Sequence, residues 1–259
     1  MMEWAFSFAD LEYFLLVLVR VTMFIAIAPF FSMSNTPRNV RIVLGFFISV
    51  LLYYSMPRTE VVYETLVGYS ILVLKEAVTG LLIGFAANIC TTIVTFAGHV
   101  ADMEMGLSMA SIFDPATKSQ STISGVYYNY MILLMLILTG MHRYLIKALA
   151  ETYILIPVNG MVFHTDKLLS SMLLFVSNYL MIGFRICLPV FSVMLILNAV
   201  LGVLAKVSPQ LNMFAVGIQM KVFVGLCVLF VTTAMLPGAA DLIFEQMKIM
   251  VVSFVEAIR

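Results

Sequence analysis

The residues of this sequence that could hydrolyse a bond or hold a metal are three histidines and one nearby acid. His99 lies close to Asp102, whereas His142 and His164 stand alone. No histidine pair has the His-Glu-x-x-His spacing that puts two ligands on one helix face, and no Gly-x-Ser-x-Gly elbow presents a nucleophile. We therefore expect no catalytic site, no metal and no cofactor. An intramembrane enzyme is an alternative that rests on these four side chains alone.

The cysteines add no further chemistry. Cys90, Cys187 and Cys227 are far apart, and each lies within an apolar run. Their spacing fits neither a metal site nor a disulfide framework. We expect all three to be packing residues.

The composition is far more apolar than that of a soluble domain. Of 259 residues, 63% are hydrophobic and 11% are charged, against roughly 45–50% and 25% in soluble domains. The chain has too little polar surface to cover a soluble globule. Its 14 basic residues equal its 14 acidic ones, so no basic stripe is available for nucleic acid. We expect a membrane protein that does not bind DNA or RNA.

Long apolar runs without strand alternation predict an all-α fold. The six runs are Leu11–Phe31, Ile42–Met56, Ala77–Ala97, Ile123–Met141, Leu168–Ala205 and Val222–Phe244. Four of them match the roughly 20 residues that cross a bilayer as a helix. Ile42–Met56 is short enough to be a buried or interfacial helix. Leu168–Ala205 contains Pro189 and is nearly two spans long, so it is either a helical hairpin or one long, kinked helix.

Charged residues do not fit a simple serpentine in lipid. Lysines and arginines are divided almost equally between the two sides of a six-span arrangement, so they set no orientation. Arg20, Lys75–Glu76 and Arg185 lie within or beside apolar runs. Such groups must pair, face water or protein, or reach toward the headgroups. One interpretation is that these side chains face neighbouring subunits or an aqueous path. For Arg20 and Lys75, the alternative is that the side chain snorkels to the headgroups.

Small and polar residues recur at four-residue spacing in and after the third run. The first group is Glu76, Gly80 and Gly84, and the second is Gly98, Asp102 and Gly106. This spacing places each group on one helix face, where glycine lets another backbone approach closely. We expect Glu76, Gly80, Gly84, Gly98 and Asp102 to form a helix-packing face.

Two breaks between the runs are distinctive. The first, residues 106–122, begins with an oddly apolar stretch and then turns at Asp114–Pro115. It is either an ordinary connecting loop or a loop buried in protein that closes a passage. The second break follows Lys206, where Pro209 interrupts the helix and Asn212 can satisfy freed backbone groups.

These features together resemble a known family, the FliR/SctT family of type III secretion export-gate subunits. The most specific stretch comprises Lys206, Pro209, Gln210 and Asn212, followed by Gly217 and Lys221. The glycine ladder and the loop with Phe113, Asp114 and Pro115 extend the resemblance over essentially the whole chain.

The resemblance implies a non-enzymatic subunit of the flagellar export gate in the bacterial cytoplasmic membrane, at the flagellar basal body. Such a subunit joins FliP-like and FliQ-like subunits around a pore for unfolded exported proteins, and meets FlhB-like and FlhA-like export proteins. It also implies a FliP-like part over 1–165 and a FliQ-like hairpin over 166–259.

The resemblance further implies roles for the two breaks. The first would be a plug that closes the pore, and the second a turn that contacts neighbouring subunits. The plug residues are Gly106, Leu107, Met109, Ile112, Phe113, Asp114 and Pro115, and the contact-turn residues are Lys206, Pro209, Gln210, Asn212, Gly217 and Lys221. A polytopic transporter of small solutes is the main alternative, because glycine-broken helices with intramembrane charges also build substrate sites.

Overall fold

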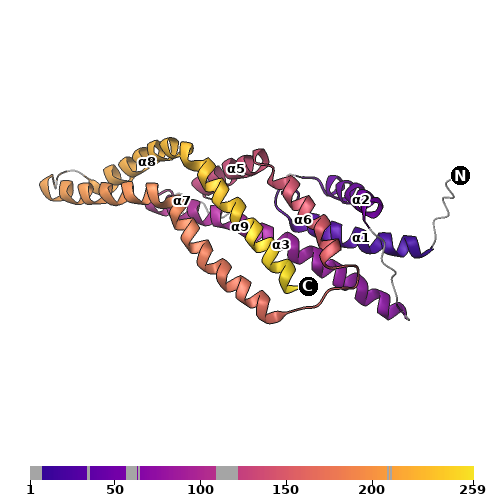
Figure 1. The fold of residues 1–259 in the computed structure, drawn as a ribbon. Helices are drawn as coiled ribbons and strands as arrows, with labels where there is room; N and C mark the ends of the chain where they lie inside the picture. The colour runs from indigo at the N-terminus through magenta and orange to yellow at the C-terminus, as the bar shows by residue number, and fades with distance from the viewer. Residues whose placement is uncertain are drawn as a thin grey trace. The chain divides into compact units, whose positions relative to one another are not determined.

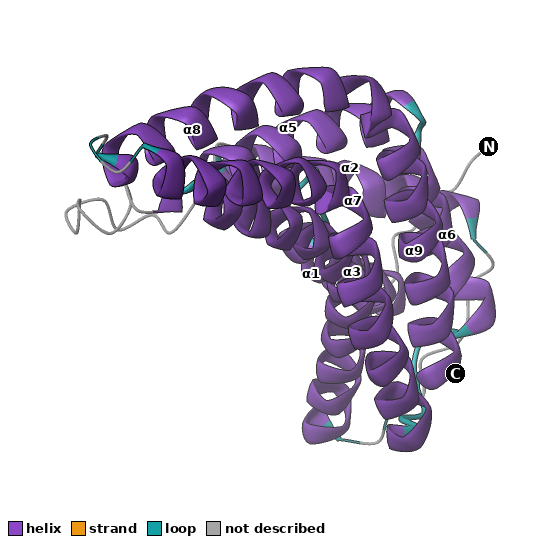
Figure 2. Cartoon of the chain, turned by 90° about the vertical axis from the view of Figure 1, so that its left-hand side faces the viewer, coloured by secondary structure: helices purple, strands orange, loops and turns teal. Residues whose placement is uncertain are grey.

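A computed structural model describes residues 8–33, 36–56, 63, 65–108, 122–208, 210 and 212–259 of the chain, and the regular elements in these ranges are all helical (Figure 2). The elements, in chain order, are α1 (Phe8–Ile27), α2 (Arg38–Ser55), α3 (Leu66–Met105), α5 (Ile123–Leu138), α6 (Met141–Leu155), α7 (Thr165–Val207), α8 (Met213–Thr232), the 3₁₀ turn η1 (Thr233–Met235) and α9 (Leu236–Ala257) (Figure 1). The predicted all-α fold is confirmed.

Caps and glycines explain where several helices begin and end. The Thr122 side chain accepts a hydrogen bond from the Gly125 amide at 3.3 Å and so caps α5. Gly140 has a positive φ of 83°, a backbone conformation that suits glycine. It ends the fourth apolar run early and separates α5 from α6, a helix that the apolar runs did not predict.

Three described helical segments are long and apolar enough to cross a membrane. They are Leu66–Met105, Thr165–Val207 and Ala215–Ala257, with a fourth if α5 and α6 form one broken span. The long fifth run is one continuous helix, α7, rather than a hairpin. The first run is not among the candidates, because α1 carries Asp10 and Arg20 as well as Glu12. The number of runs therefore does not equal the number of spans.

The chain forms two compact units, each built from separate stretches of sequence. Unit 1 comprises Met1–Ile89, Gly140–Phe175 and Gln246–Arg259, and unit 2 comprises Cys90–Thr139 and Val176–Glu245. The helices α3, α7 and α9 each contribute residues to both units. The predicted division at residue 165 concerns likeness to other gate subunits, and it stays a prediction.

Unit 1 has a core of aliphatic and aromatic side chains between α1, α2, α3 and α6. Leu16 and Phe24 of α1 are completely covered, and the Phe14 and Tyr53 rings meet edge to face at 5.8 Å. The amide of His164 donates to the Ala257 carbonyl at 2.9 Å, which ties the start of α7 to the C-terminal helix. Outside the helices, the Tyr63 hydroxyl donates to the Glu12 carboxylate, and this bond raises the pKa of Tyr63.

Candidate functional site

A fully buried ion pair joins α1 to α3 in unit 1. Arg20 Nε donates to Glu76 Oε2 at 2.5 Å, and neither side chain is exposed to solvent. Arg20 Nη1 also donates to the Ile156 carbonyl at 3.1 Å. From the sequence, Arg20 could reach toward the headgroups or contact a neighbouring subunit. In the structure it pairs within the chain.

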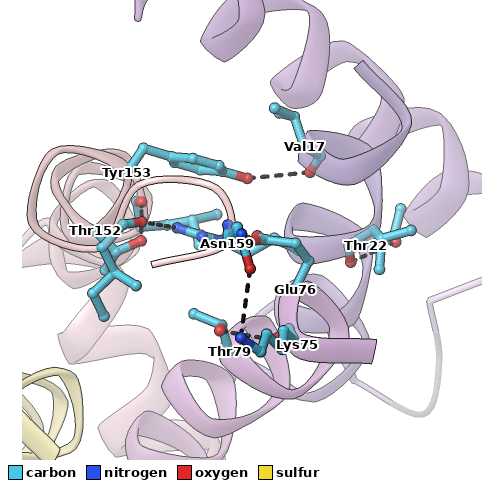
Figure 3. Close-up of polar contacts among 12 residues, drawn as sticks. Val17, Thr22, Lys75, Glu76, Thr79, Thr152, Tyr153 and Asn159 are labelled. Atoms are coloured by element: carbon cyan, nitrogen blue, oxygen red, sulfur yellow. Dashed lines mark hydrogen bonds and ion pairs between the residues drawn. The ribbon is translucent and has the colours of Figure 1, made fainter. Parts of the chain in front are cut away.

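The end of α6 and the loop after it contribute Tyr153 and Asn159, which lie beside Glu76 in Figure 3. The Arg20 guanidinium lies 4.2 Å above the Tyr153 ring, and the Tyr153 hydroxyl donates to the Val17 carbonyl at 3.1 Å. The Asn159 amide donates to Glu76 Oε1 at 3.3 Å, so both carboxylate oxygens of Glu76 are used. A paired, hydrogen-bonded and covered carboxylate has no access to a substrate. The cluster therefore holds three elements together and performs no chemistry.

Gly80 and Gly84 allow α3 to lie directly on the backbone of α1. A Cβ added to Gly80 would overlap the Arg20 carbonyl, and one added to Gly84 would lie 2.8 Å from the Phe24 carbonyl oxygen. Glu76 lies on the same side of α3, one turn before Gly80. The close approach places the backbone of Arg20 against α3, near the point where the Arg20 side chain pairs with Glu76.

In unit 2, Gly98 and Asp102 hold α3 against the start of α5. A Cβ on Gly98 would overlap the backbone of Gly125, so the two helices touch without side chains between them. Asp102 is 1% exposed, and its Oδ2 accepts a hydrogen bond from the Ser124 amide at 2.9 Å. A carboxylate at the start of a helix satisfies an otherwise unpaired amide.

Among the predicted plug residues of the first break, Gly106 and Leu107 are described, and they directly follow α3. Gly106 has a positive φ of 79°, and a Cβ added there would meet no atom within 4 Å. The backbone turn at the end of α3 therefore suits glycine for its conformation rather than for its space. The other predicted plug residues lie outside the residues that the structure describes: Met109, Ile112, Phe113, Asp114 and Pro115.

The second break joins α7 to α8. Lys206, Gln210 and Asn212 are exposed, whereas Lys221 is half-buried and Gly217 is buried. The Asn212 side chain accepts from the Ala215 amide at 3.5 Å and caps α8. Pro209 lies outside the described part of the chain.

Comparison with known proteins identifies the family of this chain. Residues 11–247 match the family described as bacterial export proteins, family 1. The chain belongs to this family. Alignments with curated relatives, each called flagellar biosynthetic protein FliR, cover between 84% and 94% of its length.

Three such relatives illustrate the range. The Bacillus subtilis protein is 30% identical over 220 residues, covering 84% of this chain and 85% of the relative. The Escherichia coli protein is 25% identical, with 88% and 87% covered. The protein from Buchnera aphidicola subsp. Baizongia pistaciae is 24% identical, with 94% and 95% covered. The alignments thus extend over nearly the whole of both chains.

Membership of this export family identifies the chain as a non-enzymatic membrane component of an export apparatus. Within the described ranges, no group of three histidine, cysteine or acidic side chains is placed to hold a metal. The three cysteines differ in burial. Cys90 and Cys187 are buried, as expected for packing residues, while Cys227 is exposed.

Arg20 and Glu76 each stand out in the sequence as a charged residue, but no sequence pattern predicts that they pair. Their positions are 56 residues apart. The available signal was that each is a charged residue in or beside an apolar run, and such charges often pair.

Proposed function

We propose that this chain is a subunit of the flagellar type III export gate, where it helps to form and close the pore through which unfolded flagellar proteins enter. The observation that carries the proposal is the family match over residues 11–247. The gate would lie in the bacterial cytoplasmic membrane at the flagellar basal body. Its other members would be FliP-like and FliQ-like subunits, with FlhB-like and FlhA-like export proteins nearby. A small-solute transporter has no comparable support.

Closure of the pore is proposed for the first break, at Gly106, Leu107, Met109, Ile112, Phe113, Asp114 and Pro115. Support comes from the chemistry of its apolar side chains, which can exclude water and ions from a lumen. Further support comes from the two ends of the break. Gly98 and Asp102 anchor the end of α3 to the start of α5, so the intervening segment would be presented from a fixed base.

Ion leakage tests this closure. Gates lacking residues 108–113 should conduct ions at rest, whereas wild-type gates should not. A control replaces the polar residues 117–121 with glycine and serine at constant length, and it should leave the resting conductance low. Unchanged conductance after the apolar deletion would remove the plug from the proposal while leaving gate membership intact.

Contact with neighbouring subunits is proposed for the second break, at Lys206, Pro209, Gln210, Asn212, Gly217 and Lys221. The exposed side chains of Lys206, Gln210 and Asn212 leave this turn available to a partner, such as an FlhB-like protein. Pro209→Ala and Asn212→Ala proteins should assemble less well with their neighbours. Normal assembly and export by both variants would make the turn a connector only.

A two-part organisation completes the proposal. The chain would combine a FliP-like part over 1–165 with a FliQ-like hairpin over 166–259. In support, α7 begins at Thr165, and α7 and the α8–α9 segment are two long helical segments joined by one short turn. If the analogy is correct, a cysteine placed in the 206–221 turn should crosslink to a FliQ-like neighbour in assembled gates. Crosslinks to FliP-like neighbours alone would contradict it.

A further inference from the structure

A cavity in unit 2 lies where the helices α5, α7 and α9 meet. Its volume is about 280 Å³, and its lining is mostly apolar, with Ile186 and Leu236 among the side chains. Three polar side chains also line it: Arg185, Tyr128 and Thr232. Neither the plug nor the contact turn uses this cavity.

Arg185 is the charged residue of the lining, and it is exposed. No acidic side chain of the described chain forms an ion pair with it. Asp241 of α9 is exposed and does not line the cavity. The contrast with Arg20 is direct, because Arg20 is buried against Glu76. Arg185 therefore presents an uncompensated positive charge in a helix that is otherwise a candidate membrane span.

The position of Arg185 along α7 gives its depth if this part of the helix crosses a membrane. Residues 186–205, between Arg185 and Lys206, carry no charged side chain. A helix of about 20 residues rises about 30 Å, which equals the thickness of the hydrocarbon core. Arg185 and Lys206 would then lie at opposite boundaries of the hydrocarbon, at the level of the lipid phosphates.

Two of the helical segments around the cavity depart there from regular α-helical hydrogen bonding. Pro189 has no amide hydrogen, so the Arg185 carbonyl, one turn earlier, loses its helical donor. Opposite it, the 3₁₀ turn η1 separates α8 from α9, and Met235 of this turn lines the cavity. Pro189, the 3₁₀ turn and Gly238, which has no side chain, thus all lie at the cavity.

We propose that this cavity is a binding site for an anionic phospholipid. Arg185 binds the phosphate through charge-assisted hydrogen bonds. The Thr232 hydroxyl already donates to the Leu229 carbonyl at 3.1 Å, so Arg185 is the donor on which the site depends. The apolar lining takes the first part of an acyl chain. This inference requires only that α7 meets lipid, and it does not depend on the plug or on the contact turn.

The lining favours an amphiphile over the other possible occupants. A free phosphate would use Arg185 and leave the apolar surface of Ile186, Leu236 and Leu242 against water. A single acidic side chain from a neighbouring subunit would neutralise the charge without filling about 280 Å³. A net negative lipid is favoured over a zwitterionic one because the lining contributes one unpaired positive charge.

Native mass spectrometry of the full chain in detergent tests the site, with phosphatidylglycerol and phosphatidylcholine of identical acyl chains as probes. Wild type should bind the first phosphatidylglycerol roughly tenfold more tightly than phosphatidylcholine, as expected for one charge-assisted contact. Arg185→Gln should abolish this preference. Lys147→Gln removes an exposed charge that does not line the cavity, and it should leave the preference unchanged.

A second variant tests the apolar part without removing the charge. A Cβ added to Gly238 would meet no atom within 4 Å, so the fold can accommodate a larger side chain there. Because Gly238 lines the cavity, the side chain of Gly238→Leu can occupy part of it. It should weaken both lipids about equally and preserve the preference between them. Equal lipid binding by wild type and Arg185→Gln would overturn the proposal. So would displacement of phosphatidylglycerol by millimolar inorganic phosphate, or crosslinking of position 185 to an acidic residue of a neighbouring subunit in assembled gates.

Discussion

Removal of the Glu76 charge is the perturbation with the largest predicted effect on stability. Glu76→Gln keeps the size of the side chain but leaves the Arg20 guanidinium fully buried without a counter-charge. Breaking one side of a buried ion pair costs about 3–5 kcal/mol. In a protein of this length, that corresponds to a fall in Tm of roughly 6–20 °C.

A double-mutant cycle separates the pairing from simple loss of packing. Arg20→Met should also destabilise the protein, because it leaves Glu76 buried without its partner. The double variant contains no buried charge at this site, so it should be more stable than the sum of the two single losses predicts, by about 2–3 kcal/mol. The measurement is the temperature at which each detergent-solubilised protein loses its monodisperse peak on size exclusion.

Tyr153→Phe is the matched control for this cycle. It keeps the ring over Arg20 and loses the hydrogen bond to the Val17 carbonyl, at a cost of about 1 kcal/mol. Additive losses in the double variant, or a Glu76→Gln protein as stable as wild type, would refute the assignment of Arg20 and Glu76 as a coupled pair.

Three further predictions concern the helix junctions. Gly98→Ala should lower the Tm, because the added methyl overlaps the opposing backbone, whereas Gly202→Ala, whose Cβ meets nothing within 4 Å, should be neutral or stabilise α7 by about 0.5–1 kcal/mol. Asp102→Ala should cost about 1–3 kcal/mol by leaving the Ser124 amide unpaired, and protection of that amide from hydrogen exchange should fall. Asn212→Ala should lower the stability of the isolated chain by only about 0.5 kcal/mol, since its long capping hydrogen bond is exposed. A clear loss of assembly with partner subunits would therefore indicate a contact of Asn212 with a partner.

The sequence predicted the helices well where local periodicity determines them. Four-residue spacing of Gly80 and Gly84 indicated a close approach, and the structure shows that the approaching backbone is α1. The sequence could not name that partner, since spacing within one helix carries no information about what lies opposite. The same limit applies to Arg20 and Glu76, which are 56 residues apart.

Other differences have identifiable physical causes. Pro189 is compatible with a turn or with a helix that continues past a missing hydrogen bond, and α7 takes the second course. The helix α6 was not predicted because its polar residues, including Arg143, Lys147 and Glu151, interrupt the apolar pattern. The cavity at Arg185 depends on three helices from distant parts of the chain, so no local pattern could indicate it.

The most direct test of gate membership is co-expression of the tagged full chain with FliP-like and FliQ-like subunits, followed by native mass spectrometry of the purified material. We expect one stable hetero-oligomer that contains this chain together with both kinds of partner. Recovery of the chain alone or as a homo-oligomer, with solute transport after reconstitution without partners, would contradict it.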